Sequence, residues 1–201
     1  IAIDDDGGKS ALAATGVTVR NLAPKLVLDA VGAIDEDGVA TLTGTILDAG
    51  TLDTFALEIN WGDGLSPQNV QVFLYPAADG SQKFTLTHRY LDDNPGGTAA
   101  DTYTISARVT DDDGGQGEHA TTVTVRNTAP KLVLDAVSAI DENGIATLTG
   151  TIIDQGTLDT FTLLVNWGDA LSPQNEQVFV YGAADGSQRF TLTHRYLDDN
   201  P

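Results

Sequence analysis

The residues of this sequence best suited to chemistry are oxygen-bearing side chains gathered in short loops. Asp48 and Asp53 share one loop, and three consecutive aspartates, 111–113, precede a pair of glycines. Carboxylate oxygens are the ligands that Ca2+ prefers, and the ion takes about six to eight of them. Aspartate is also an ordinary turn residue, because its side chain bonds to nearby backbone amides. These loops are therefore either a cation site or solvated turns.

Catalytic chemistry has less support in the sequence. The chain has no cysteine and only three histidines, and it contains no Gly-x-Ser-x-Gly or His-Glu-x-x-His motif. His88 and His194 lie on an expected inward row, two residues before a tyrosine, which favours hydrogen-bonded core histidines. Every plausible pair of carboxylates lies in a turn that the sequence repeats. We therefore expect no enzymatic activity.

The balance of charge limits the partners of the protein. The 201 residues include 29 acidic and 10 basic side chains, which gives a formal charge of −19. Such a charge disfavours nucleic acids and anionic membrane surfaces. No apolar run approaches the ~18 residues needed to cross a bilayer, so no membrane insertion is expected. The start at Ile1, without methionine or a signal peptide, indicates an internal piece of a longer protein.

The aspartate loops must be positioned by β-strands. Phe55, Leu57, Ile59 and Trp61 alternate with small or polar residues, which is the pattern of a strand with one buried face. The segment Gly62-Asp-Gly then ends this strand in a tight turn. A strand that carries the large aromatic side chain typically anchors the core of a β-sandwich.

The whole repeat predicts an all-β fold, an antiparallel immunoglobulin-like sandwich of about seven strands. In this strand order, the start of the first strand, the loop after the second and the loop before the last meet at one pole. That pole would bring together Asn21, Asp48, Asp53 and Asp111. The expected strands are 25–31, 39–47, 55–61, 70–75, 84–90, 103–109 and 123–125.

The sequence repeats itself with a period of 106 residues. Residues 127–201 match residues 21–95 at 61 of 75 positions. The copy supplies a second candidate site that begins with Asn127, Asp154 and Asp159. Such duplication is typical of long arrays in which each unit contacts only its neighbours.

The repeat sets the expected domain boundaries. Residues 21–126 form a complete sandwich, and residues 127–201 form a second sandwich that lacks its last two strands. Residues 1–20 are expected to be the last strands of a preceding repeat, because their Asp-Asp-Asp-Gly-Gly and Val-Thr-Val-Arg segments recur before residue 127.

Several motifs of the repeat carry a family resemblance. They are Asn-x-Ala-Pro, Leu-Thr-Gly-Thr, Asn-Trp-Gly-Asp-Gly, Thr-His-Arg-Tyr and Val-Thr-Asp-Asp-Asp-Gly-Gly. Together they resemble the PKD (polycystic kidney disease) domain, in the tandem form of very large bacterial surface proteins and adhesins. The resemblance implies extracellular display, a spacer or binding role and, in some members, Ca2+ bound at the pole by a linker asparagine and aspartates. Ala170 departs from the final glycine of the Trp-Gly-Asp-Gly motif.

The expected function is therefore that of a non-catalytic spacer or stalk in a bacterial surface adhesin or filament, with Ca2+ stiffening the joints. The alternative is a carbohydrate- or protein-binding accessory domain of a secreted hydrolase, which would need an exposed aromatic patch. Trp61 falls on the buried row, so core packing is favoured over a sugar platform.

The two units are expected to stack end to end through a short, stiff joint. A second acidic group, residues 35–37 and 92–93, would then face the pole of Asn127, Asp154 and Asp159, and the like charges would repel unless cations or water intervene.

The ends of the chain are expected to be complementary. Residues 1–20 of one chain would complete the last unit of the next, head to tail. The alternative is one continuous polypeptide with the same packing.

Overall fold

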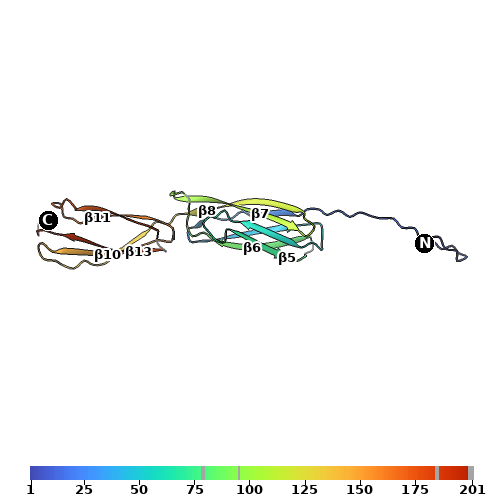
Figure 1. Cartoon of the computed structure of the whole chain (residues 1–201), viewed down its shortest axis with the longest axis horizontal. Coiled ribbons are helices and arrows are strands. Elements are labelled where there is room, and N and C mark those ends of the chain that lie inside the picture. The colour runs from blue at the N-terminus through green and yellow to red at the C-terminus, as the bar shows by residue number, and fades with distance from the viewer. Residues whose placement is uncertain (78–79, 95, 184–185, 199–201) are drawn as a thin grey trace.

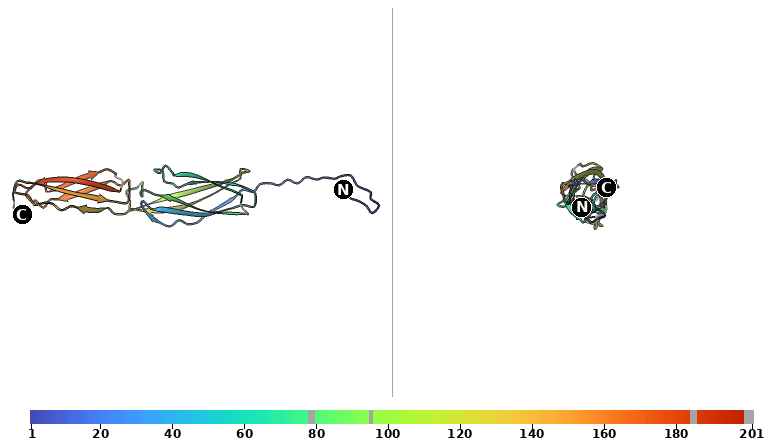
Figure 2. Two further views of the ribbon diagram at one scale, coloured as in Figure 1. Left: turned by 90° about the horizontal axis from the view of Figure 1, so that it is seen from below. Right: turned by 90° about the vertical axis from the view of Figure 1, so that its right-hand side faces the viewer.

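The chain is all-β, and a computed structural model describes residues 1–77, 80–94, 96–183 and 186–198. Two units of β-structure follow one another along the long axis (Figure 1). A view turned by 90° shows the same end-to-end arrangement, with the N-terminal segment leading away from the first unit (Figure 2). No helix capable of crossing a bilayer occurs in the described part of the chain.

The first unit is a sandwich of two sheets. One sheet has the order β1-β3-β6 and the other β2-β8-β7-β4-β5. This division of successive strands between two facing sheets is that of an immunoglobulin-like sandwich. The strands are β1 (Lys25–Leu28), β2 (Ile34–Asp35), β3 (Val39–Leu47), β4 (Phe55–Asn60), β5 (Val70–Tyr75), β6 (Ser81–Arg89), β7 (Ala100–Asp111) and β8 (Gln116–Arg126).

The core of the first unit contains the residues that the alternating pattern placed inward. Leu57, Ile59 and Trp61 are fully buried, and Phe55 is nearly so. Tyr90 closes this row by donating a hydrogen bond of 2.8 Å from its hydroxyl to the Trp61 carbonyl. The expected inward row of β6 is confirmed, since Phe84, Leu86, His88 and Tyr90 are buried or half-buried.

The strand pattern departs from expectation in several places, and β6 begins at Ser81 instead of residue 84. β1 ends at Leu28 instead of continuing to residue 31. β7 and β8 are longer than predicted because they pair continuously from Ala100↔Arg126 to Thr110↔Gln116. An eighth strand, β2, lies parallel to β8, so the sheet is not purely antiparallel. Two residues are too few to produce a periodic pattern in the sequence.

In its described residues the second unit repeats five strands of the first unit, β1 and β3 to β6, in the same register. Its sheets have the orders β13-β10-β9 and β11-β12. Gly150 pairs with Phe190 as Gly44 pairs with Phe84. The strands are β9 (Lys131–Leu134), β10 (Ile145–Ile153), β11 (Phe161–Asn166), β12 (Glu176–Tyr181) and β13 (Ser187–Arg195).

The first strands of the two units have the same sequence but different surroundings. Leu26 and Leu28 of β1 are 4% and 7% exposed, whereas Leu132 and Leu134 of β9 are 47% and 53% exposed. β1 is covered by β8, which contacts it directly. Within the described residues, no strand covers β9 in this way.

Residues 1–20 form little regular structure. An isolated bridge joins Ile3 to Lys9 near the N-terminus. The rest of the segment connects this bridge to the first unit as an extended chain (Figure 1). Val17 and Val19, expected in a strand, are 88% and 87% exposed. Their counterparts Val123 and Val125 are buried because β8 pairs with β7. The expected strand is therefore absent here, since an isolated extended segment has no ladder partner.

Candidate metal centre

The first candidate centre lies at the free pole of the first unit. Asp48 and Asp53 flank the loop between β3 and β4, and Asp111 ends β7. One carboxylate oxygen from each lies within 4.8 Å of the others. The structure thus brings together the three aspartates that the strand order predicted at this pole. Asn21 also reaches it, donating from Nδ2 to Asp111 Oδ2 over 2.8 Å.

The electrostatics of this pole reflect repulsion among its carboxylates. Partial burial raises the pKa of Asp53, and the Asp48 carboxylate raises it further, as do residues 111–113. Asp48 Oδ1 accepts a hydrogen bond from the Gly50 amide, while its buried Oδ2 has no hydrogen-bond partner among the described residues. The Asp111 carboxylate accepts from Gly115 as well as from Asn21. A hard cation would relieve this concentration of negative charge.

The predicted copy of the centre lies at the joint between the units. Asp154 is 8% exposed, and its Oδ1 accepts a hydrogen bond from the Gln155 amide. Asp159 lies close enough for the Asp154 charge to act on it. Asn127 is exposed, and its backbone amide donates to the Ala99 carbonyl over 3.2 Å.

The joint places acidic residues of the first unit against this copy. One carboxylate oxygen each from Glu36, Asp92 and Asp159 lies within 4.8 Å of the others. Glu36 and Asp92 are 1% and 6% exposed. Neither was among the predicted ligands, although both belong to the acidic group expected to face the second unit. The sequence thus revealed the acidic group, but it does not show which of its carboxylates come close to those of the second unit.

Burial and like charges raise the pKa of two joint carboxylates, those of Glu36 and Asp159. Burial raises the pKa of Glu36 to about 7, with Asp159, Asp154 and Asp93 adding to the shift and the hydrogen bond from Thr128 opposing it. Burial likewise raises the pKa of Asp159 to about 6, helped by Asp92 and Asp154.

Further hydrogen bonds between described residues cross the joint, besides the one from Asn127 to Ala99. The Thr128 amide donates to Glu36 Oε1 over 2.6 Å, and the Thr157 amide donates to the Leu91 carbonyl over 3.2 Å. On the first unit's side, the Glu36 amide donates to the Arg126 carbonyl at the end of β8. The Glu36 turn is therefore fixed to its own sheet and to the next unit at once.

Two of the three histidines, His88 and His194, occupy buried sites of a different kind. His88 Nε2 lies 3.0 Å from Asp63 Oδ2, and the imidazole stacks on Trp61 with ring centroids 5.1 Å apart. His194 repeats this arrangement with Asp169 and Trp167. Both histidines are 4% exposed, as expected for hydrogen-bonded core residues.

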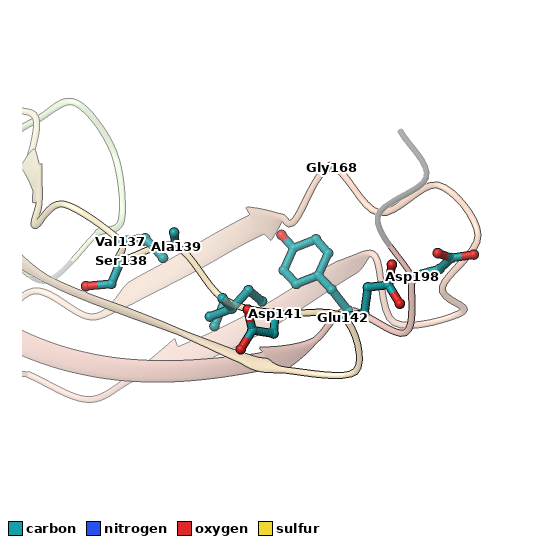
Figure 3. A pocket seen from close by; sticks show the side chains of 10 residues that line it. Val137, Ser138, Ala139, Asp141, Glu142, Gly168 and Asp198 are labelled. Carbon is teal, nitrogen blue, oxygen red and sulfur yellow. The ribbon is translucent and has the colours of Figure 1, made fainter.

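A groove opens along the second unit where the first unit is closed. Figure 3 shows Val137, Ser138 and Ala139 leading to Asp141 and Glu142, with Gly168 and Asp198 on the other side. In the first unit, the equivalent segment pairs with β8 through Ile34↔Val125 and Asp35↔Arg126.

No family model and no curated protein sequence matches this chain. Among solved structures, the chain is similar to a crystal structure of the calcium binding domain CBD12 of CALX1.1, at 9% sequence identity and a TM-score of 0.32. The similarity covers 85% of this chain and 78% of that one. The strand order of the two sheets defines the chain as immunoglobulin-like all-β.

Proposed function

We propose that this chain is a non-catalytic spacer segment, made of tandem PKD-like sandwiches, in an extracellular bacterial surface protein such as an adhesin or filament. The observation that carries the proposal is the end-to-end stacking of two copies of one unit (Figure 2). A stack of this kind gains length with every repeat and leaves the sides of the sandwiches uncovered.

The joint supports a mechanical role. The connection from Arg126 to Lys131 is short and contains Pro130, whose fixed φ limits bending. The hydrogen bonds from Thr128 to Glu36 and from Thr157 to Leu91 restrain rotation of one unit against the other.

The alternative, a carbohydrate-binding accessory domain, has less support. Sugar platforms use exposed aromatic rings, and the described residues include all 2 Trp, 5 Tyr and 6 Phe of the chain. None of these rings belongs to an exposed residue. The apolar side chains most open to solvent are aliphatic, such as Leu74 of β5 and Val180 of β12.

Calcium is the proposed stiffening ion of the spacer. At the free pole it would be bound by Asp48, Asp53 and Asp111, with Asn21 offering its side-chain oxygen after rotation of the amide. Binding to the folded state alone would raise the melting temperature by mass action.

Neighbouring repeats are the proposed partners, joined head to tail. The support is that the segment of the first unit equivalent to one side of this groove pairs with β8, so a segment resembling β8 would fit there. Either the 17–20 segment of another copy or a continuous polypeptide would supply that segment.

Small-angle X-ray scattering of the chain tests the spacer role. The expected pair-distance distribution is that of an elongated particle whose length is close to two sandwiches end to end, both with calcium and with chelator. A compact, side-by-side pair would contradict the proposal.

A further inference from the structure

Five carboxylates converge where the two units meet. None of the ion pairs or His–Asp contacts found among the described residues involves this joint group, so no basic side chain neutralises it there. The five are Glu36, Asp92 and Asp93 of the first unit and Asp154 and Asp159 of the second.

Three of these side chains bury an oxygen that has no partner among the described residues. The atoms are Glu36 Oε2, Asp93 Oδ2 and Asp154 Oδ2. The residues are 1%, 6% and 8% exposed, respectively. A buried carboxylate oxygen without a donor or cation is strongly unfavourable, and buried polar groups in proteins nearly always have a partner. These atoms need a cation, a proton or a water molecule as their partner.

The spacing of the oxygens fits one ion. Ligands at about 2.3–2.6 Å from a Ca2+ ion lie at most about 5 Å from one another. The oxygens of Glu36, Asp92 and Asp159 lie within 4.8 Å of one another. A Cβ at Gly156 would come within 2.6 Å of both Glu36 Oε2 and Asp159 Oδ2. Glycine at this position therefore lets carboxylates of the two units approach each other.

We propose that the joint is a composite Ca2+ site, in which Glu36 and Asp92 of one unit and Asp159 of the next bind the same ion. Asp93 and Asp154 surround it and are neutralised by it. This inference deepens the proposed spacer role and rests on it. Because neither unit supplies all the ligands, the ion binds only when two units are stacked, and it then holds them together.

The second unit contains a built-in control for this site. Glu142 and Asp198 are the counterparts of Glu36 and Asp92, although Asn143 follows Glu142 where Asp37 follows Glu36. No following unit packs against them within the described residues, and both are exposed. The buried acidic cluster thus depends on the facing pole, as a composite site requires.

Isothermal titration of Ca2+ into the chelator-treated 201-residue chain tests the proposal. Glu36→Gln and Asp159→Asn should each weaken one class of calcium site at least tenfold. Glu142→Gln, the matched change at the exposed pole, should leave the isotherm unchanged. Asp53→Asn, at the free pole of the first unit, should leave the joint site intact. Equal calcium binding by Glu36→Gln and the parent chain would overturn the proposal.

Two further measurements separate the causes of a negative result. Glu36→Gln should melt at least as high as the parent in chelator, since it removes repulsion, and a lower melting temperature would overturn the electrostatic argument. Scattering should show calcium narrowing the range of particle lengths in the parent but not in Glu36→Gln. An elongated particle that does not bind Ca2+ contradicts the composite site alone, whereas a compact particle contradicts the spacer role.

Discussion

At the scale of single residues, the pKa of Glu36 depends strongly on the carboxylates that surround it. Its turn is set by Asp37, which has a φ of 60° and forms an ion pair with Arg89. The same turn occurs at Asn143 in the second unit, where φ is 58° and Glu142 is exposed. The local sequence therefore determines the backbone conformation of the turn. The glutamate side chain is buried only where another unit packs against it.

The first prediction concerns pH in the absence of metal. Burial and the carboxylates of Asp159, Asp154 and Asp93 raise the Glu36 pKa from 4.5 to about 7. Between these two values the folded chain holds a proton that the unfolded chain has released, so stability falls as pH rises. The loss should be on the order of 1–3 kcal/mol and complete above about pH 7. Urea unfolding in chelator at a series of pH values measures it.

The control for this prediction is Glu36→Gln, which cannot titrate. In Glu36→Gln the free energy of unfolding should depend much less on pH between about pH 4.5 and 7. Glu142→Gln should keep the pH dependence of the parent. Saturating calcium should also reduce the slope in the parent, because an ion favours the ionised carboxylates. A slope that is the same in all three proteins would show that Glu36 is not the group responsible.

The second prediction uses the paired glycines of the Trp-Gly-Asp turns. Gly62 and Gly168 have φ values of +76° and +75°, a region that disfavours side chains. A Cβ at Gly62 would lie 2.5 Å from the Thr104 carbonyl oxygen of β7, whereas a Cβ at Gly168 meets nothing within 4 Å. Gly62→Ala should therefore cost about 1–3 kcal/mol more than Gly168→Ala. Equal losses in denaturant unfolding would mean that β7 does not approach this turn so closely.

At the scale of elements, the alternating pattern was sufficient to predict most strands. β3, β5, β10 and β12 show period-2 burial, and β4 carries the predicted buried row up to Trp61. Such patterns report a local property, the division of one strand into two faces. The strand order then placed three of the predicted carboxylates at one pole without further information.

The elements that the sequence did not predict depend on partners far away in the sequence. β2 exists because Ile34 and Asp35 pair with Val125 and Arg126, which follow about ninety residues later. The joint cluster likewise needs the packing of one unit on another, which the sequence of either unit does not contain. Single-sequence patterns cannot specify such contacts, because tertiary context overrides local preference.

The third prediction compares the identical strands β1 and β9. Leu26 is 4% exposed under β8, while Leu132 is 47% exposed. Leu26→Ala should destabilise the first unit by about 2–5 kcal/mol, as is usual for a buried leucine. Leu132→Ala should cost the second unit less than about 1 kcal/mol, because little area is lost on truncation. Hydrogen exchange read by peptide separates the two units, and a large effect at Leu132 would mean that β9 is covered in solution.

At the scale of the whole molecule, the two poles of each unit are both acidic. The chain carries a formal charge of −19, and the facing poles concentrate part of it in one joint. Repulsion of this kind favours separation of the units unless a cation intervenes. A spacer built this way would be stiff in calcium and looser without it, so its stiffness would depend on the calcium concentration around it.

The fourth prediction concerns the open groove of the second unit. Leu132 and Leu134 are about half exposed there, and β11 pairs only with β12 in the described part of the chain, whereas its counterpart β4 also pairs with β7. A separate peptide with the sequence of residues 100–126, the β7–β8 hairpin, should add to β11 and cover β9. Burial of the two leucines and completion of the β11 ladder provide the driving force.

Hydrogen exchange of the 201-residue chain with added peptide measures this complementation. Amides of β9 and β11 should gain protection, while those of β1 and β4, whose partners are already in place, should not change. A peptide with Val123 and Val125 replaced by aspartate should bind at least tenfold more weakly, because both valines are buried in the first unit. Protection that appears equally with the aspartate peptide would mean that the groove is not a strand site. Protection specific to the native peptide would identify the side of the sandwich through which successive repeats are completed.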